Sequence, residues 1–578
     1  MKKYINRNYF WASLFVKQLE VLGIKNVCIS PGSRNTPLTL AFALNKKIKK
    51  YVHIDERSSG FFALGLAKKT KQPVAIVTTS GTAVAELYPA IIEAYQQRVP
   101  LIVCTADRPS YLRNSGANQT INQENIFRNH IRKFSDVGLP QLSKNKLYSF
   151  CKKTAEIIKI ATEKDKGPVH INFPFEKPLE PDSFTDNINL KLTDFIVPES
   201  SCRKIKEGNL NQVIAKVAKF PKTIILLGWD NFDKTFYKKL LRFSKQSNIP
   251  IFTDGTSDLR FFNNSKSIIV NHSSFFKSEI VKEKIEPDLI LQFGNAPTSQ
   301  TMLRFLEETK AKIILINEFG DKKNASKKKC EIVKVKPENL LNELIKIKIQ
   351  KDKDWYEKIL KLDEIAERVK NRIINKSEFN FEPAIVNELL KAIPEKSNLF
   401  ISNSMPIRDY DFFASKNSKQ INIFTNRGAS GIDGIISTAS GIASKSKNKN
   451  FLIIGDLAFY HNLNALASLN EFGIPLVIVL INNNGGGIFN MLPVASNKKY
   501  FEKYFITSQN LNYKKIVYAF GGKYFSPKSK NKLKQNIIEA SELKLFSVIE
   551  IKTDSKKSLL LRKKYWSEIK QAVEQNDN

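Results

Sequence analysis

Short apolar runs and amphipathic stretches alternate along most of the chain. In the first 180 or so residues, apolar runs within 26–30, 51–55, 73–81 and 100–109 are separated by segments with a helical spacing of apolar positions. Such continuous runs are typical of strands buried on both faces, and strands that alternate with helices form parallel sheets. We therefore predict a first, parallel α/β domain over residues 1–185.

Two further series show the same alternation. Residues 200–345 contain strand-like runs such as TIILL, and residues 380–578 contain FLIIG and LVIVLI. Between them, residues 346–379 are rich in charge but keep an apolar stripe of helical period, which predicts a connecting helix. The predicted fold class is therefore α/β, with three doubly wound parallel-sheet domains.

The composition fits a large protein with buried cores. The chain has 578 residues, 42% of them hydrophobic, and no stretch approaches the roughly 18 apolar residues that a membrane span needs. The N-terminus lacks the apolar segment of a secretory signal, so we expect a cytoplasmic protein with no membrane span. The five cysteines and five histidines lack the spacing of a disulfide framework or a metal cluster, so we expect reduced thiols and structural or surface histidines.

The net charge of +36 raises the question of a nucleic-acid partner, because clustered Lys and Arg neutralise phosphates. The lysines are instead spread over the whole chain, in polar segments that also contain many Asn. A solvated basic surface explains this distribution better, and it would also attract anionic substrates. We expect no nucleic-acid partner, and DNA binding measured at several salt concentrations would test that alternative.

Two turns carry the most informative side chains. GDL at 455–457 follows the run FLII, and NNNGGG at 482–487 follows LVIVLI. Open α/β sheets bind ligands at the carboxyl ends of their strands, where glycine-rich turns expose amides to phosphate. Asp456 offers a carboxylate, Asn483 an amide oxygen and Gly485 a backbone carbonyl, all suited to Mg²⁺. Either turn alone would more often be an ordinary turn, but together they predict a site for Mg²⁺ and a diphosphate.

This pair of turns resembles the diphosphate motif of thiamine-diphosphate enzymes, and further segments resemble one family among them. PGSRNTPLTLA, DERSSGFFALGLAK, TTSGTAVAELYPAIIEA, TADRP and GANQTI occur in the order of that family, followed by NSMPIR, NRGASGIDG, GDLAFYHNLNAL and NNNGGGIF. The family is that of the 2-succinyl-5-enolpyruvyl-6-hydroxy-3-cyclohexene-1-carboxylate synthases, and Leu457 looks like its variant of the motif. The resemblance covers both outer domains and implies the thiamine-diphosphate enzyme fold.

The resemblance implies two cofactors, thiamine diphosphate and Mg²⁺, with Mn²⁺ as a substitute. The Glu56 carboxyl would protonate N1′ of the aminopyrimidine, so that the neighbouring nitrogen can take the C2 proton. Gln119 is implied as the second catalytic residue. The implied cofactor-binding residues are Glu56, Ile432, Asp456, Asn483 and Gly485, and the last three would also bind the metal.

The implied reaction is the decarboxylation of 2-oxoglutarate and the conjugate addition of the succinyl unit to isochorismate, in menaquinone or phylloquinone biosynthesis. Both substrates are dianions, and arginine binds carboxylates bidentately. A homodimer, or a dimer of dimers, is also implied. In the middle domain Gln300 stands where the family carries a basic residue, and Arg304 is the nearby cation. The implied substrate-binding residues are Ser33, Arg34, Arg108, Asn118, Ser404, Arg408, Arg427, Ile488, Phe489 and Leu492.

Two other functions stay open at this point. A 2-oxoacid decarboxylase or an acetohydroxyacid synthase would share the cofactor residues, but an enzyme for small monoanions has less need of so many arginines. A catalytically silent relative is disfavoured because Glu56, Asp456 and Asn483 are all present. Assays with 2-oxoglutarate and with pyruvate, and a cofactor titration, would separate these possibilities.

Overall fold

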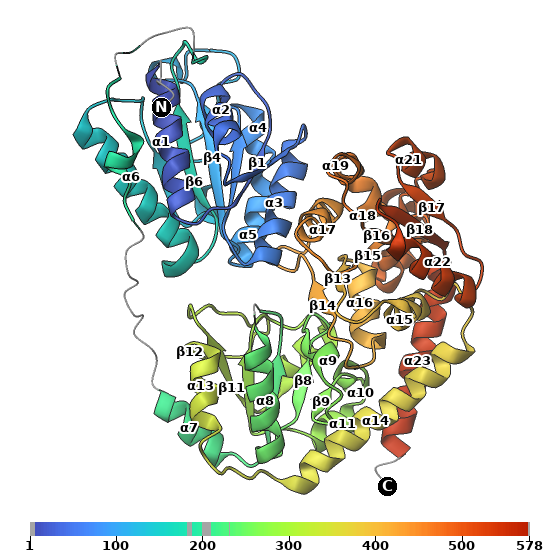
Figure 1. Ribbon diagram of the computed structural model, residues 1–578. Coiled ribbons are helices and arrows are strands. Elements are labelled where there is room, and N and C mark those ends of the chain that lie inside the picture. Colours follow the sequence, from blue (N-terminus) through green and yellow to red (C-terminus); the bar gives the residue numbers. More distant parts are fainter. Residues whose placement is uncertain (1–5, 182–185, 187, 199–209, 231, 576–578) are drawn as a thin grey trace. The chain divides into compact units, whose positions relative to one another are not determined.

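Three sheets of six strands each organise the chain, and every strand pair within them is parallel (Figure 1). The computed structural model describes residues 6–181, 186, 188–198, 210–230 and 232–575, so Cys202 lies outside the described residues. The predicted fold class is confirmed, whereas the domain boundaries stay a prediction. None of the described helices is long and apolar enough to cross a membrane.

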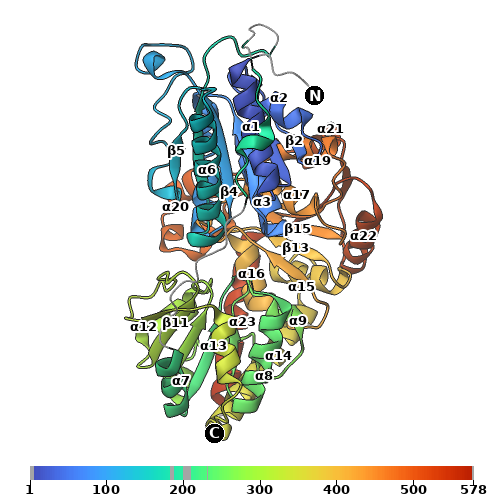
Figure 2. The same cartoon turned by 60° about the vertical axis from the view of Figure 1, so that its left-hand side comes forward.

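The first sheet has the strand order β2-β1-β3-β4-β6-β5. Its inner strands are buried along their whole length, which explains their continuous apolar runs. Helices α1 (Arg7–Val21) and α6 (Lys144–Lys159) lie side by side on one face (Figure 2). Helices α3 (Glu56–Thr70) and α5 (Tyr88–Gln96) cover the other face. The strands are β1 (Asn26–Ile29), β2 (Lys49–Val52), β3 (Val74–Thr78), β4 (Leu101–Asp107), β5 (Phe134–Asp136) and β6 (Val169–Pro174).

The second sheet has the order β12-β11-β10-β7-β8-β9, which is the strand order of dinucleotide-binding folds counted from β7. The predicted connecting helix is α14 (Lys353–Lys376), and it lies along α23 (Ser555–Gln575) with its apolar stripe buried. The strands are β7 (Thr223–Leu227), β8 (Ile251–Thr253), β9 (Ile268–Ile269), β10 (Leu289–Phe293), β11 (Lys312–Asn317) and β12 (Glu331–Lys334). Its helices include α8 (Lys234–Ser247), α9 (Leu259–Phe262), α10 (His272–Phe275), α12 (Gln300–Glu308) and α13 (Pro337–Leu344).

The third sheet has the order β14-β13-β15-β16-β18-β17, which repeats the topology of the first sheet. Gly455 pairs with Ile481, so the residues after β15 and β16 emerge side by side. The strands are β13 (Asn398–Ile401), β14 (Asn422–Phe424), β15 (Asn450–Gly455), β16 (Val477–Asn482), β17 (Lys523–Phe525) and β18 (Ser547–Lys552). Its helices include α15 (Glu382–Ala392), α16 (Met405–Phe413), α18 (Asp456–His461) and α22 (Lys530–Glu542).

The described residues form two compact units. Unit 1 contains the first sheet together with α17 (Ile435–Ala443) and α19 (Ala465–Glu471), and unit 2 contains the second and third sheets. Within unit 1, α17 packs along α3. A Cβ at Gly65 would lie 2.0 Å from the Thr438 carbonyl oxygen, and one at Gly441 would lie 2.1 Å from the Phe62 carbonyl oxygen. The close crossing therefore requires glycine on both helices.

Candidate active site

Loops that follow β3 and β4 meet beyond the carboxyl ends of these strands in unit 1. The Arg108 guanidinium contacts the Ser80 hydroxyl and donates to the Gln119 carbonyl oxygen at 3.1 Å. Gln119 has a φ of +55°, a left-handed conformation that is uncommon outside glycine. Asn118 is exposed on the same loop. The structure thus brings Arg108, Asn118 and Gln119 to one edge of the sheet.

Arg34, in the loop after β1, reaches the same region. Its Nη1 donates to the Phe175 carbonyl oxygen at 2.8 Å. Burial lowers the pKa of Arg34, and the positive charge of Arg108 lowers it further. Two guanidinium groups close enough to repel each other would gain from an anion between them. Ser33 is the exposed neighbour of Arg34, so this edge also holds the first pair of predicted substrate residues.

Glu56 is the first residue of α3, in the turn that follows β2. Asp55 caps the helix by accepting from the backbone N–H groups of Arg57 and Ser58 at 3.0 and 3.3 Å. Burial raises the pKa of Glu56, and the negative charges of Asp55 and Glu86 also raise it. A raised pKa favours the protonated carboxyl, which is the form that can give a proton to a ring nitrogen.

Arg427 and Ile432 belong to a loop of unit 1 that precedes α17. Both side chains are half-buried. The Glu93 carboxylate accepts from the backbone N–H groups of Gly428 and Ala429 at 2.8 and 2.6 Å, which ties the loop to α5. This loop therefore has a fixed backbone, as a loop that positions a cofactor needs.

In unit 2, the two predicted metal-binding turns lie side by side. The Asp456 carboxylate accepts from the Gly485 and Leu457 backbone N–H groups, both at 2.8 Å. Gly485 has a φ of +144°, and a Cβ there would lie 2.2 Å from the Ile506 carbonyl oxygen, so only glycine fits. Burial raises the pKa of Asp456 to about 6, and the negative charge of Glu382 adds to this. A divalent cation would stabilise the charged carboxylate.

Asn483 also fits a metal ligand. Its Nδ2 donates to Glu382 Oε1 at 2.9 Å. Its Oδ1 is buried and has no hydrogen-bond partner among the described residues. A buried amide oxygen without a partner is unfavourable, and oxygen is the ligand that Mg²⁺ prefers. Asp456, Asn483 and Gly485 therefore suit the predicted cofactor metal.

Ser404 and Arg408 lie together at the start of α16. Ser404 directly precedes the helix and has a φ of +70°, and a strained non-glycine residue of this kind costs about 1–3 kcal/mol. Such strain persists where the surrounding structure enforces it, often at functional sites. Arg408 Nη1 donates to the Ser404 carbonyl oxygen at 2.6 Å. The structure thus places two predicted substrate residues in one strained turn of unit 2.

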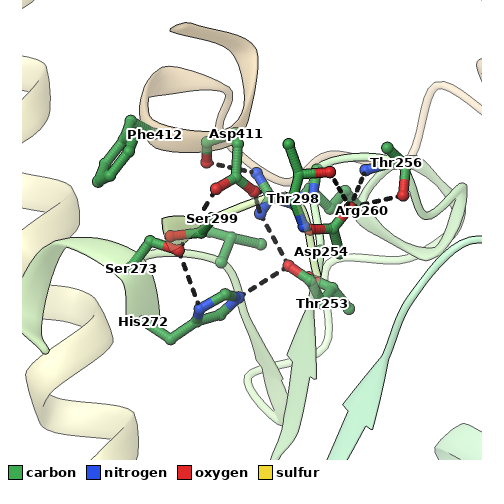
Figure 3. A network of polar contacts seen from close by, with 12 residues as sticks. Thr253, Asp254, Thr256, Arg260, His272, Ser273, Thr298, Ser299, Asp411 and Phe412 are labelled. Carbon is green, nitrogen blue, oxygen red and sulfur yellow. Dashed lines mark hydrogen bonds and ion pairs between the residues drawn. The ribbon is translucent and has the colours of Figure 1, made fainter. Parts of the chain in front are cut away.

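Helix α16 is anchored from the second sheet by a buried ion pair (Figure 3). Arg260 of α9 donates to the Asp411 carboxylate at 3.0 Å and to the Asp411 carbonyl oxygen at 2.9 Å. The same carboxylate accepts from the Gly255 N–H at 2.8 Å and from the Ser273 hydroxyl at 3.3 Å. Because Arg260 and Asp411 are both buried, this network fixes the helix that carries Arg408.

The three apolar residues among the predicted substrate-binding residues lie after β16, on the short helix η5 (Gly487–Met491) and just beyond it. Ile488 and Phe489 are half-buried, and Leu492 is 47% exposed. The Phe489 ring packs edge-on against Phe505, with 5.5 Å between the ring centroids. Since Leu492 is largely exposed, core packing does not account for this residue.

Arg304, the basic residue near Gln300, is paired with a glutamate of its own helix. Gln300 is the exposed first residue of α12. Arg304 Nε donates to Glu308 Oε1 at 2.6 Å, and the Arg304 side chain is 65% exposed. Arg304 therefore belongs to a surface ion pair between two residues that are about one helical turn apart.

Three buried charged residues behind Asn483 were not predicted: Glu382, Asp409 and Arg562. They lie on α15, α16 and α23, and the arginine forms ion pairs with both carboxylates. In the sequence, Glu382 has the position of an ordinary acidic residue at a helix start, and Arg562 lies in a lysine-rich segment. Only the tertiary fold brings them together, so no local pattern could have identified them.

Two family models match the chain. The thiamine pyrophosphate enzyme N-terminal TPP binding domain matches residues 11–126, and the C-terminal TPP binding domain matches residues 412–551. A 2-succinyl-5-enolpyruvyl-6-hydroxy-3-cyclohexene-1-carboxylate synthase from Bacillus cytotoxicus is 33% identical, over 98% of this chain and 97% of that protein. The chain belongs to this synthase family. It is thus a thiamine-diphosphate-dependent enzyme, as the sequence motifs implied.

Other comparisons agree with the family. Synthases of the same name from Haloquadratum walsbyi and Listeria monocytogenes are 35% and 34% identical and cover 96% and 97% of this chain. The alignments cover 97% and 98% of those synthases. A benzoylformate decarboxylase from Polynucleobacter necessarius has a TM-score of 0.69 at 16% identity, over 94% of this chain and 98% of its own. That likeness shows the shared fold.

Proposed function

We propose that the chain decarboxylates 2-oxoglutarate and adds the succinyl unit to isochorismate, giving CO₂ and 2-succinyl-5-enolpyruvyl-6-hydroxy-3-cyclohexene-1-carboxylate for menaquinone or phylloquinone biosynthesis. The full-length similarity to synthases of that name supports the reaction. Within the molecule, the main support is that the guanidinium groups of Arg34 and Arg108 lie at one edge of the first sheet, which suits a dianionic substrate.

We propose that Asp456, Asn483 and Gly485 hold Mg²⁺, or Mn²⁺ in its place, against the diphosphate. When bound, thiamine diphosphate would supply a nucleophilic carbon at its deprotonated C2 and an acceptor for the electron pair left when CO₂ departs. The Glu56 carboxyl donates a proton to N1′ of the aminopyrimidine. Its raised pKa supports this role.

The other predicted residues would bind substrate and exclude water. Arg34, Arg108, Arg408 and Arg427 would pair with the carboxylates of the two substrates, because a guanidinium keeps its charge when dehydrated. Ser33, Asn118, Gln119 and Ser404 would add hydrogen bonds near the reacting atoms. Ile432 would support the bound cofactor, and the apolar side chains of Ile488, Phe489 and Leu492 would keep water from the reacting carbon.

The choice of 2-oxo acid tests this proposal against the related decarboxylases. With thiamine diphosphate, Mg²⁺ and isochorismate present, CO₂ release should require 2-oxoglutarate. Pyruvate should be a poor substrate, because it lacks the second carboxylate that the arginines would bind. Equal rates with both acids would instead favour an enzyme for small monoanionic 2-oxo acids.

Removal of the Asp456 carboxylate should weaken cofactor binding. We expect Asp456→Ala to lower the affinity for thiamine diphosphate and Mg²⁺ by about 10- to 100-fold, because the metal loses its single charged ligand from the protein. The affinity can be measured by calorimetric titration of the purified variant. Unchanged affinity would remove Asp456 from the metal site.

A homodimer is the smallest active unit that we propose, with Glu56 of one chain serving the cofactor held by Asp456 of the other. At thiamine diphosphate and Mg²⁺ concentrations that just saturate the parent, Glu56→Gln and Asp456→Ala proteins should each have little activity alone. After subunit exchange, a mixed dimer would contain one intact site, so the mixture should regain partial activity. If exchange is shown by differently tagged subunits and no activity returns, the shared site is wrong.

A further inference from the structure

Glu382 is a buried carboxylate, and both of its oxygens accept hydrogen bonds. It is 1% exposed and lies at the start of α15. Its Oε1 accepts from Asn483 Nδ2 at 2.9 Å and from the Thr553 hydroxyl at 3.1 Å. Its Oε2 accepts from Arg562 Nη2 at 2.6 Å. One oxygen of Glu382 thus binds Arg562, and the other binds the Asn483 amide and the Thr553 hydroxyl.

Arg562 is held in place by a second carboxylate. Its Nε and Nη2 donate to the two oxygens of Asp409 at 2.8 and 2.7 Å, and its side chain is 4% exposed. This bidentate pair fixes the plane of the guanidinium. Because the guanidinium plane is fixed, one Glu382 oxygen, Oε2, accepts from Nη2. The other oxygen, Oε1, then faces Asn483.

The contact with Glu382 decides which way the Asn483 amide points. An ionised carboxylate only accepts hydrogen bonds, whereas an amide has a donating and an accepting end. Turning the amide over would set Oδ1 against Glu382 Oε1, two acceptors in a buried place. Oδ1 therefore points away from Glu382, and it is the oxygen that has no partner among the described residues.

The preceding residue provides an internal comparison. Asn482 Nδ2 donates to Glu550 Oε1 at 2.6 Å, and Glu550 is 3% exposed. This pair has the same chemistry, but the Asn482 Oδ1 accepts from the Asn484 N–H at 2.9 Å. A structural role thus accounts for Asn482 completely. For Asn483 the same restraint leaves a directed, unpaired oxygen, which is what a metal ligand requires.

We propose that Glu382, held by Arg562, is the positioning residue that orients the Asn483 amide so that Oδ1 binds the divalent metal ion. This inference rests on the proposed metal role of Asn483. Glu382 itself would not touch the metal. Its part is to keep the donating end of the amide away from the cation, and so to raise metal affinity.

An exchange of the two functional groups tests this arrangement. In Glu382→Gln, the oxygen of the new side-chain amide should accept from Arg562, so its NH₂ group faces Asn483. This donor favours the reversed orientation of the Asn483 amide, with Oδ1 toward position 382. In Asn483→Asp, two carboxylates face each other. The double variant Glu382→Gln/Asn483→Asp restores one donor and one acceptor, with the number of charges unchanged. The carboxylate introduced at position 483 would then present an oxygen to the metal.

The readout is Mn²⁺ affinity in the presence of thiamine diphosphate, measured from the electron paramagnetic resonance signal of free Mn²⁺. We expect each single variant to lose about 10- to 100-fold in affinity, as for other groups that orient metal ligands. The double variant should recover to within about threefold of the parent, because the two changes are coupled. Glu550→Gln is the matched control and should also stay within about threefold, with thermal unfolding recorded for every protein.

Several results would overturn the proposal. Parental Mn²⁺ affinity in Glu382→Gln would show that the amide needs no such restraint, and additive losses in the double variant would exclude the pairing. An equal loss in Glu550→Gln would mean that any buried carboxylate here matters only for packing. If Glu382→Gln does not fold, Arg562→Lys takes its place, because lysine keeps the charge without the fork. It should lower Mn²⁺ affinity, and parental affinity would contradict the role of Arg562.

A failure of the metal assignment would look different. If Asn483→Ala binds Mn²⁺ like the parent while Asp456→Ala does not, Asn483 is not a metal ligand. The positioning role of Glu382 is then wrong as well, because it depends on that ligand. If Asn483→Ala loses Mn²⁺ affinity while Glu382→Gln keeps it, the metal site stands and only the positioning role of Glu382 is wrong.

Discussion

Replacing Glu56 by glutamine is expected to slow the loss of the C2 proton of thiamine diphosphate by about 10²- to 10⁴-fold, the usual contribution of a positioned acid or base. Glutamine keeps the size of the side chain and can still hydrogen-bond N1′, but it cannot give up a proton. Burial and the nearby Asp55 and Glu86 charges raise the pKa of the Glu56 carboxyl, which favours its protonated form. The glutamine amide has no such acidic proton.

Cofactor binding and activation should therefore separate in Glu56→Gln. The proposed diphosphate and metal ligands are other residues, so thiamine diphosphate should bind within about tenfold of the parent, while deuterium exchange at C2 becomes slow. Glu86→Gln is the control, because Glu86 is an exposed carboxylate near Glu56. It should slow exchange far less than Glu56→Gln, because the Glu86 charge is the smallest of the contributions that raise the pKa of Glu56. Exchange at the parental rate in Glu56→Gln would mean that another group activates the cofactor.

The second large effect is expected for Arg408→Ala. Loss of a charge-assisted contact to a buried carboxylate costs about 2–4 kcal/mol, which corresponds to about 30- to 1000-fold in affinity. We expect this loss in the use of 2-oxoglutarate, with thiamine diphosphate affinity retained. Helix α16 should stay in place, because Asp409 and Asp411 on the same helix keep their buried ion pairs.

Saturation kinetics for each substrate provide the measurement for Arg408→Ala. Arg304→Ala is a suitable control, because that arginine lies in an exposed ion pair with Glu308 on one helix. Its effect should be small for both substrates. If Arg408→Ala instead raised the KM for isochorismate and left that for 2-oxoglutarate unchanged, the assignment of Arg408 to 2-oxoglutarate would be wrong.

Much of the fold was predictable because local patterns reflect it. Strands such as β4 and β16 are buried almost throughout, so their sequences are continuous apolar runs with turn residues at the ends. The same patterns placed Asp456 and Asn483 at the ends of two strands. The pairing of Gly455 with Ile481 then makes these strands neighbours in the sheet, which spacing alone could not establish.

Contacts between distant segments were not predictable. Glu382 and Arg562 bond to each other across the chain, and their surroundings in the sequence are those of ordinary helix residues. The same is true of Arg260 and Asp411, which join a short helix of the second sheet's domain to α16. Such pairs depend on the packed arrangement of whole helices, and a single sequence carries no local sign of it.

The mass of the product provides a direct test of the proposed reaction. The protein is incubated with isochorismate, 2-oxoglutarate, thiamine diphosphate and Mg²⁺, with carbon-13 placed either in the carboxylate next to the keto group or in the keto carbon. We predict a product whose mass equals the sum of the two substrates less CO₂. The keto-carbon label should remain in it, and the carboxylate label should leave as CO₂. Release of CO₂ with formation of succinic semialdehyde alone, while isochorismate stays unchanged, would show that the protein decarboxylates 2-oxoglutarate without adding the succinyl unit to isochorismate.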